Sequence, residues 1–136
     1  IKEYKAQIMG LPGPGEEKIA KEIAEKIENN CIILTAPPLP LDLLKVAIEK
    51  SWLVISNDTG PRHIATAFRK PVVVIMGPTD PRYTDYEYDK MLVIRKELDC
   101  SPCHLKVCPR EHECMKLITP DEVFDKIKKF VQEKGI

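Results

Sequence analysis

The sequence lacks an excess of charge of either sign. Lysine plus arginine and aspartate plus glutamate each number 21 in 136 residues, so the formal net charge is zero. This balance argues against a nucleic-acid-binding protein, because such proteins usually carry a basic excess. With 43% apolar and 31% charged residues, the chain has the composition of a globular protein rather than a disordered one.

Long apolar runs are also absent. No segment of the sequence reaches the length that spans a membrane, and the first residues lack a signal-peptide pattern. We therefore expect a cytoplasmic location. We see no internal repeat, and 136 residues suit one domain with one core. The sequence accordingly predicts a single domain over residues 1–136, with a cysteine-rich segment at 99–115.

Segments with strand and helix character alternate along the chain. Strands are predicted at 4–9, 31–34, 52–55, 71–76 and 92–94, and helices at 16–28, 41–48, 61–68 and from Pro120 onward. Ile19, Ala20, Ile23, Ala24 and Ile27 give the first helix an apolar face. Thr119 is a suitable cap for the last helix, because Glu122 stands three residues after it. This order predicts an α/β fold, with a Rossmann-like parallel sheet and helices on both faces.

The stretch SNDTGPRH, residues 56–63, follows a predicted strand and opens a helix. In open parallel sheets, ligands bind beyond the carboxyl ends of the strands. The N–H groups at a helix N-terminus suit phosphate, so Thr59 and Gly60 are candidates for phosphate binding. Asp58 would repel a bare phosphate and suits sugar hydroxyls, while His63 lies one turn into the helix and can point back at this site. The plain alternative is a turn and a helix cap.

The run ISNDTGPRHIATAFRKPVVVIMGPTDP resembles glycosyltransferase family 9, the lipopolysaccharide heptosyltransferases. The later LDCSPCHLKVCPREHECM is similar to the heptosyltransferase II branch. The resemblance covers the chain from about Tyr4 onward, and the first forty residues match only in pattern. It implies a two-domain GT-B architecture, of which this chain is similar to the C-terminal half, the half that binds the nucleotide sugar.

The resemblance also implies a substrate and a site. The family's donor is ADP-L-glycero-D-manno-heptose, its acceptor is the lipopolysaccharide inner core, and transfer inverts the anomeric centre. The family residues that line the diphosphate and the sugar match Asp58, Thr59, Gly60, Pro61 and His63. The usual small or apolar spacer before the histidine is Arg62 in this chain, which is expected to add a charge near the site.

Two further substrate-binding residues follow from a looser match. Glu16 would hold the ribose hydroxyls and Leu39 would flank the adenine. Each has a plain alternative, since Glu16 also suits a helix N-terminus and Leu39 also suits a core. The loop at 77–80, which follows the fourth predicted strand, can face the sugar or be a simple turn.

The resemblance places the catalytic base outside this chain. In the family it is a carboxylate of the N-terminal domain, and the C-terminal domain begins with a strand, a loop carrying a phosphate-binding lysine, and a helix. This chain matches the family only after that first βα unit. We therefore expect no catalytic residue here, an isolated chain that is inactive, and a gap in the sheet that homodimerisation can fill.

Four cysteines within fifteen residues form a cluster of candidate metal ligands. They are Cys100, Cys103, Cys108 and Cys114. A C-x-x-C pair can hold two corners of a tetrahedral zinc site, and His104 or His112 can substitute for a thiolate. The second pair lacks the usual spacing, so paired or free structural cysteines are favoured over zinc, and zinc over an iron–sulfur cluster. No cofactor is required, and a structural zinc is the alternative.

The sequence thus predicts the donor-binding half of an inverting heptosyltransferase. The alternatives are a non-catalytic module that binds nucleotide sugars and a metal-stapled interaction module in which the 56–63 stretch is only a turn. The expected partners are an ADP-sugar donor, the lipopolysaccharide core acceptor and the missing N-terminal domain, with no nucleic acid. Lysines on the last helix can contact an anionic surface, so peripheral association with the inner membrane is a further expectation.

Overall fold

A computed structural model describes residues 4–27, 31–34, 39–84 and 87–136. Its contacts divide the chain into two compact units, Ile1–Val46 and Ala47–Ile136, where the sequence predicted one domain. The boundary between the units falls inside helix α2 (Leu41–Lys50). The predicted end of the first helix, at residue 28, lies outside the described residues.

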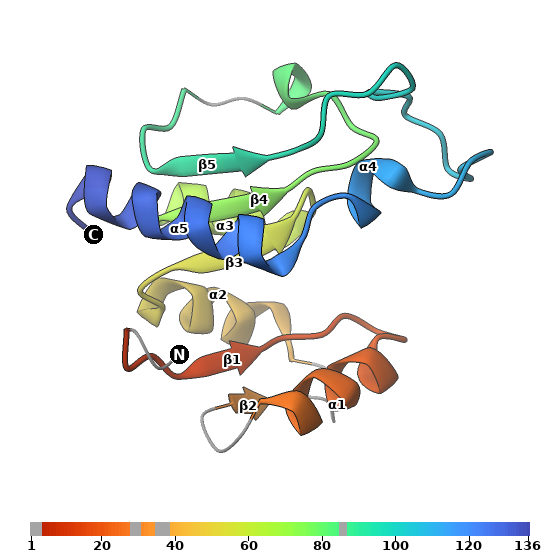
Figure 1. Ribbon diagram of the computed structural model, residues 1–136. Coiled ribbons are helices and arrows are strands. Elements are labelled where there is room, and N and C mark those ends of the chain that lie inside the picture. Colours follow the sequence, from red (N-terminus) through yellow and green to blue (C-terminus); the bar gives the residue numbers. More distant parts are fainter. Residues whose placement is uncertain (1–3, 28–30, 35–38, 85–86) are drawn as a thin grey trace. The chain divides into compact units, whose positions relative to one another are not determined.

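The first unit contains a parallel strand pair and a helix. Strands β1 (Ile8–Gly10) and β2 (Cys31–Ile33) pair in parallel, and helix α1 (Glu17–Lys26) lies between them in the chain (Figure 1). Of the predicted apolar face of α1, Ala20 is buried, while the side chains of Ile19 and Ile23 are 60% and 46% exposed. The helix is thus confirmed, but its predicted apolar face is only partly covered.

The second unit is a three-stranded parallel sheet with helices. Its elements are β3 (Val54–Asn57), α3 (Gly60–Ala67), β4 (Val72–Ile75), the 3-10 helix η1 (Pro81–Tyr83), β5 (Met91–Ile94), α4 (Glu113–Lys116) and α5 (Pro120–Lys134). The strand order is β3-β4-β5, and both pairs are parallel. In this register Asn57 lies beside Ile75, and Ile75 beside Ile94. The carboxyl ends of the three strands therefore lie at one edge of the sheet.

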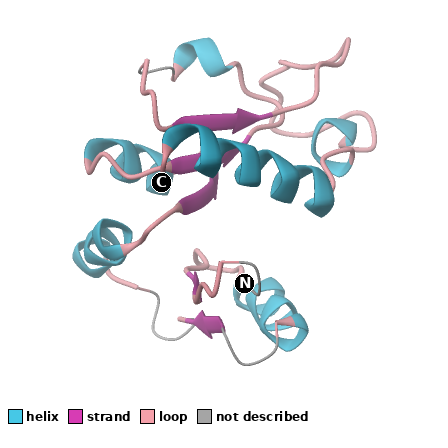
Figure 2. Ribbon diagram, turned by 60° about the vertical axis from the view of Figure 1, so that its left-hand side comes forward, coloured by secondary structure: helices cyan, strands magenta, loops and turns pink. Residues whose placement is uncertain are grey.

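Helices α3 and α5 cover opposite faces of this sheet. Figures 1 and 2 show α5 crossing one face, and α3 packs against β3 and β4 from the other. The core of this unit consists of apolar side chains that are at most 8% exposed: Ile48, Ala65, Val72, Val73, Val74, Met76, Ile94, Ile127, Phe130 and Val131. Central strand β4 is apolar throughout because both of its faces are covered, as is typical of parallel sheets.

Most predicted elements are present, with shifted ends. β3 runs over 54–57 rather than 52–55, because its pairing begins where the Val54 N–H donates to the Pro71 carbonyl. The predicted cap of α5 is confirmed, since the Thr119 hydroxyl accepts from the Glu122 N–H at 3.2 Å. The sequence missed η1 and α4, which are too short to show a periodic pattern.

The predicted fold class is confirmed as α/β with parallel strands. The expectation of one sheet is not met in the described residues, where the five strands form two separate sheets, β1-β2 and β3-β4-β5. No described helix combines the length and the apolar character that crossing a membrane requires.

Candidate functional site

The turn between β3 and α3 lies at the carboxyl edge of the second unit's sheet. Asn57, Thr59 and Gly60 are exposed there. Thr59 has an extended backbone (φ −140°, ψ 178°) and precedes α3, whose first turn contains Pro61. Proline suits this position because the first N–H groups of a helix have no partner within the helix. The sequence therefore ends β3 and starts α3 within three residues, with the turn facing solvent.

Gly60 leaves the N-terminus of α3 open. A Cβ added at this glycine would meet no heavy atom of the described residues within 4 Å. The Gly60 N–H and the positive end of the α3 dipole favour an anionic group at such a place. The next residue, Pro61, has no N–H, and the Arg62 N–H donates to the Thr59 carbonyl at 3.2 Å. The predicted phosphate-binding residues Thr59 and Gly60 thus stand at an exposed helix N-terminus, with room for a ligand beside the backbone.

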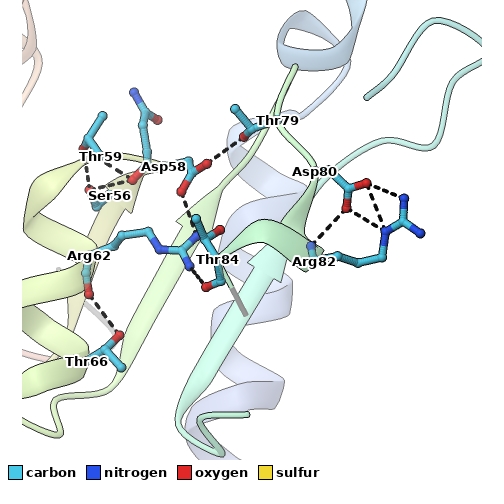
Figure 3. A network of polar contacts seen from close by, with 10 residues as sticks. Ser56, Asp58, Thr59, Arg62, Thr66, Thr79, Asp80, Arg82 and Thr84 are labelled. Atoms are coloured by element: carbon cyan, nitrogen blue, oxygen red, sulfur yellow. Dashed lines mark hydrogen bonds and ion pairs between the residues drawn. The ribbon is translucent and has the colours of Figure 1, made fainter. Parts of the chain in front are cut away.

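Asp58 points inward, and both of its carboxylate oxygens are engaged (Figure 3). Oδ1 accepts from Nη1 of Arg62 at 2.8 Å, and Oδ2 accepts from the Thr79 hydroxyl at 2.7 Å. The side chain of Asp58 is 13% exposed. Each oxygen keeps a second acceptor position, so sugar recognition stays a prediction, but the contacts that are present join segments of the protein.

Arg62 is buried, which the sequence did not reveal. Its side chain is 1% exposed, and Nη2 donates to the backbone carbonyl of Thr84 while Nη1 binds Asp58. The predicted extra charge near the site is therefore paired with the Asp58 carboxylate. The signal was available in part, because aspartate and arginine four residues apart are a known local pair.

The loop after β4 lies beside this turn at the same sheet edge. It contributes Thr79 to the Asp58 network and ends in Asp80, which is 5% exposed and binds Arg82 through side chain and backbone. The hydrogen bonds from the Arg82 side chain and its backbone N–H lower the pKa of Asp80 from 3.8 to about 2. Asp80 thus starts helix η1 as a fixed anion and holds the loop that carries Thr79.

The other predicted site residues are Pro61, His63, Glu16 and Leu39, which are divided between the two units. Pro61 and His63 lie in the first turn of α3 and are half-buried. Glu16 and Leu39 belong to the first unit, whereas Asp58 belongs to the second. Glu16 accepts from the Gly13 N–H at 2.7 Å, which closes the turn before α1. Its predicted contact with ribose and that of Leu39 with adenine stay predictions.

A cavity of about 290 Å³ adjoins Arg62. It is lined by Arg62, Pro81, Glu87, Tyr88, Met91 and Val93. Of the described turn residues, neither Thr59 nor Gly60 lines it. The open N-terminus of α3 is therefore a surface position and not part of this cavity.

The cysteine-rich segment packs on the loop after β4. The N–H groups of Cys103 and His104 both donate to the Pro78 carbonyl, at 3.0 and 2.9 Å. The Ser101 hydroxyl donates to the Gly77 carbonyl at 2.8 Å, and Cys114 Sγ would lie 3.3 Å from a Cβ added at Gly77. The C-x-x-C turn thus rests on Gly77 and Pro78, and the cysteine of α4 lies beside Gly77.

The thiols are free in the structure. Burial raises the pKa of the Cys114 thiol, and the nearby thiols of Cys108, Cys100 and Cys103 raise it further. All five cysteines fall within the described ranges, and each carries a free thiol. Within those ranges, no three His, Cys, Asp or Glu side chains are arranged to hold a metal ion. Zinc at this cluster is therefore a prediction without support from the observed geometry.

The fold and the arrangement of the turn define a Rossmann-like α/β protein with parallel strands and a ligand-accessible helix N-terminus at their carboxyl edge. The chain belongs to glycosyltransferase family 9 (heptosyltransferase), whose family model matches residues 2–113. The resemblance of the 55–81 run to this family is thereby confirmed.

Individual relatives agree with this assignment. Lipooligosaccharide heptosyltransferase 2 of Campylobacter jejuni serotype O:6 is 32% identical over 126 residues, covering 86% of this chain and 38% of that protein. Lipopolysaccharide heptosyltransferase 1 of Escherichia coli K12 is 32% identical over 68 residues, or 50% of this chain and 20% of that protein. The chain thus spans well under half the length of the relatives it matches.

The structure of E. coli ADP-heptose LPS heptosyltransferase II superposes with a TM-score of 0.73. The sequence identity is 23%, and the match covers 96% of this chain and 38% of that one. An E. coli heptosyltransferase structure with ADP gives a TM-score of 0.69 at 23% identity, over 91% of this chain and 34% of that one. At this identity the likeness concerns the fold, and it confirms the predicted fold class.

Proposed function

We propose that this chain is the donor-binding part of an inverting glycosyltransferase that moves heptose from ADP-heptose to the lipopolysaccharide inner core. Membership of glycosyltransferase family 9 supports the class of reaction, and the names of the relatives support heptose as the transferred sugar. The observation that carries the site is the exposed turn 57–60, which opens α3 at the carboxyl edge of the sheet.

In this proposal the diphosphate of the donor lies at the N-terminus of α3. The Gly60 backbone N–H donates to its oxygens, and the open space over Gly60 admits the phosphate close to the backbone. The Thr59 N–H donates to the Asn57 carbonyl at 2.8 Å and so shapes the turn that presents Gly60. His63 stands one turn further along α3, where a donor in this position can reach it. The chain contributes binding and orientation of the donor.

The catalytic base is expected from a part of the enzyme that this chain does not contain. Inverting transfer needs a carboxylate placed to take the proton from the acceptor hydroxyl as it attacks the anomeric carbon. That group must lie across the donor from α3, next to the acceptor. We therefore propose that transfer requires a second domain, and that 136 residues alone bind donor without transferring sugar.

The test is a titration of the protein with ADP and ADP-heptose, followed by amide chemical shifts. We expect both ligands to shift the resonances of Asp58, Thr59, Gly60 and His63, with smaller changes elsewhere in the second unit. A folded protein that shows no shift at these residues with either ligand would refute the proposed donor site. Uridine diphosphate serves as a matched control, because it offers the same diphosphate with a different base.

The cysteine cluster enters the proposal as a structural brace of the loop after β4. Its contacts to the Gly77 and Pro78 carbonyls support this role with the thiols free. A zinc ion shared by the four thiolates remains the alternative, and chelation distinguishes the two. A dimer and a peripheral place at the inner membrane stay predictions.

A further inference from the structure

The buried guanidinium of Arg62 needs an explanation beyond donor binding. Arg62 is 1% exposed and is among the largest side chains that are fully buried in the protein. Burying a charge is costly unless it is paired and hydrogen-bonded. A methionine or leucine would fill the same position on α3 without that cost. The charge is therefore expected to serve a purpose that an apolar residue cannot.

The contacts of Arg62 and Asp58 join the start of α3 to residues that lie 21 and 22 positions further along the chain. On α3 itself, Nη1 binds Asp58, which fixes the turn that precedes the helix. Nη2 donates to the Thr84 carbonyl, just after η1. The second oxygen of Asp58 accepts from Thr79, in the loop after β4. Figure 3 shows these side chains converging, with Asp58 between Arg62 and Thr79.

The buried residues of this network differ in role from the exposed residues of the turn: the former fix the backbone, and the latter face the ligand. Arg62 and Asp58 are 1% and 13% exposed, whereas Thr59 and Gly60, the next residues along the turn, are exposed. The inward carboxylate of Asp58 fixes the turn, so that the backbone N–H of Gly60 stays in place, although Asp58 itself does not touch the ligand. Preorganised donors of this kind bind an anion without first paying for reorganisation.

We propose that Arg62 is a positioning residue for donor binding, which acts through Asp58 and Thr79 to fix the Thr59–Gly60 backbone against the diphosphate. This inference rests on the proposed function of the same turn. The planar fork of arginine is needed, because two of its nitrogens bind a carboxylate and a carbonyl that lie in different segments. A lysine offers one nitrogen and cannot hold both in the same geometry.

The coupling between these residues supplies the test. The natural polypeptide that carries this chain is prepared as wild type, Arg62→Met, Arg62→Lys, Asp58→Asn, Thr79→Val and the double variant Arg62→Met/Asp58→Asn. The dissociation constant for ADP is measured by calorimetry at one salt concentration, and folding is checked by circular dichroism and thermal melting. Arg110→Met is the matched control, because Arg110 also forms a two-bond ion pair, with Asp99, but at an exposed position.

We expect Arg62→Met and Asp58→Asn each to weaken ADP binding by about tenfold or more, and Arg62→Lys and Thr79→Val by a smaller factor, with Arg110→Met unchanged. The double variant removes both charges, so no carboxylate is left buried and unpaired. It should fold and should bind ADP no more weakly than the weaker-binding single variant, because the two residues act as one unit.

Three outcomes would overturn the inference. Losses that multiply in the double variant would mean that Arg62 contacts the ligand independently of Asp58. Wild-type affinity in a folded double variant and in Thr79→Val would mean that the network only stabilises the fold. If the wild type itself does not bind ADP, the proposed function fails, and this inference fails with it. If the wild type binds ADP and the variants bind it equally well, only this inference fails. Should Arg62→Met not fold, the double variant and Thr79→Val decide the question.

Discussion

Gly60 stands at the start of α3 with open space where a side chain would begin. We expect Gly60→Ala to leave the fold intact, because its Cβ meets nothing and alanine favours a helix by up to about 1 kcal/mol over glycine. ADP binding should fall by about tenfold or more, since the methyl group would occupy the space through which phosphate approaches the backbone. Calorimetry and thermal melting of the variant check both halves of this prediction. A folded variant with unchanged affinity for ADP would show that the ligand does not approach this backbone.

The ionised Asp80 carboxylate should make the stability of the fold depend on pH. Hydrogen bonds from Arg82 hold its pKa at about 2, below the ordinary value of 3.8. Because the folded-state pKa is lowered, the ionised carboxylate stabilises the fold above about pH 4, and this contribution is lost as the pH falls toward 2. We expect Asp80→Asn to lower the melting temperature at pH 7 and the difference from wild type to shrink as the pH falls from 4 to 2. Thermal melts across this range measure the effect.

A control for this pH dependence is available on the surface. Glu111 pairs with Lys116 at 3.4 Å, and both side chains are more than half exposed. Such pairs contribute little, so Glu111→Gln should melt like the wild type across the same range. A gap between wild type and Asp80→Asn that stays constant down to pH 2 would contradict the assigned role of the Asp80 charge.

At the scale of elements, Gly77 marks a close contact between the loop after β4 and helix α4. A Cβ there would lie 2.6 Å from Sδ of Met115 and 3.3 Å from Sγ of Cys114. We expect Gly77→Ala to destabilise the protein by about 1–3 kcal/mol, the usual range for overpacking, as α4 is pushed away. Urea unfolding measures the loss, and Gly77→Ala/Met115→Ala, which removes the clashing sulfur, should separate the clash from any backbone effect. Wild-type stability of Gly77→Ala would mean that α4 does not rest on this loop.

The cysteine-rich segment gives a second prediction at this scale. With the observed contacts to Gly77 and Pro78 and free thiols, chelation by EDTA should change neither the melting temperature nor ADP binding. A thiol titration under denaturing conditions should count all five cysteines as free after purification with a reductant. Release of one equivalent of zinc by EDTA, with loss of the far-ultraviolet signal of this segment, would establish the metal instead. Cys31, outside the cluster, is the internal reference for the titration.

For the whole molecule, the two units should differ in stability. The second contains β4, whose Val72, Val73 and Val74 are fully buried, while in the first the side chains of Met9 and Ile32 are about half exposed. Protection from hydrogen exchange follows burial and cooperative packing. We expect amides of β1 and β2 to exchange well before those of β3, β4 and β5, as measured by mass spectrometry of peptides. Simultaneous exchange of both sheets would show that the chain unfolds as one cooperative body.

Much of this organisation was accessible from the sequence. Apolar runs bounded by proline, glycine and asparagine located the strands, and the Thr119–Glu122 pattern located the start of α5. The 55–81 run placed the candidate donor site on a strand-to-helix turn. These features are local, because hydrogen-bonding periods and caps depend on residues a few positions apart. The element ends moved by up to four residues, as at the start of β1, since pairing partners set them.

Long-range contacts were not accessible in the same way. Thr79 and Asp58 are 21 residues apart, and Arg62 and Thr84 are 22 apart. Only the parallel alignment of β3 with β4 brings these loops to one edge. For the same reason the sequence indicated only that Arg62 adds a charge near the site, whereas in the structure its side chain is buried and paired with Asp58.

The sequence by itself determined the α/β class, the position of the turn after β3 and the family to which the chain belongs, because each is written in a short run of neighbouring residues. Only the tertiary structure decided which way Asp58 and Arg62 point. Their orientation depends on Thr79 and Thr84, and on the cost of burying a charge without a partner. Packing, which joins residues that the sequence keeps apart, placed the charge of Arg62 in a buried network with Asp58.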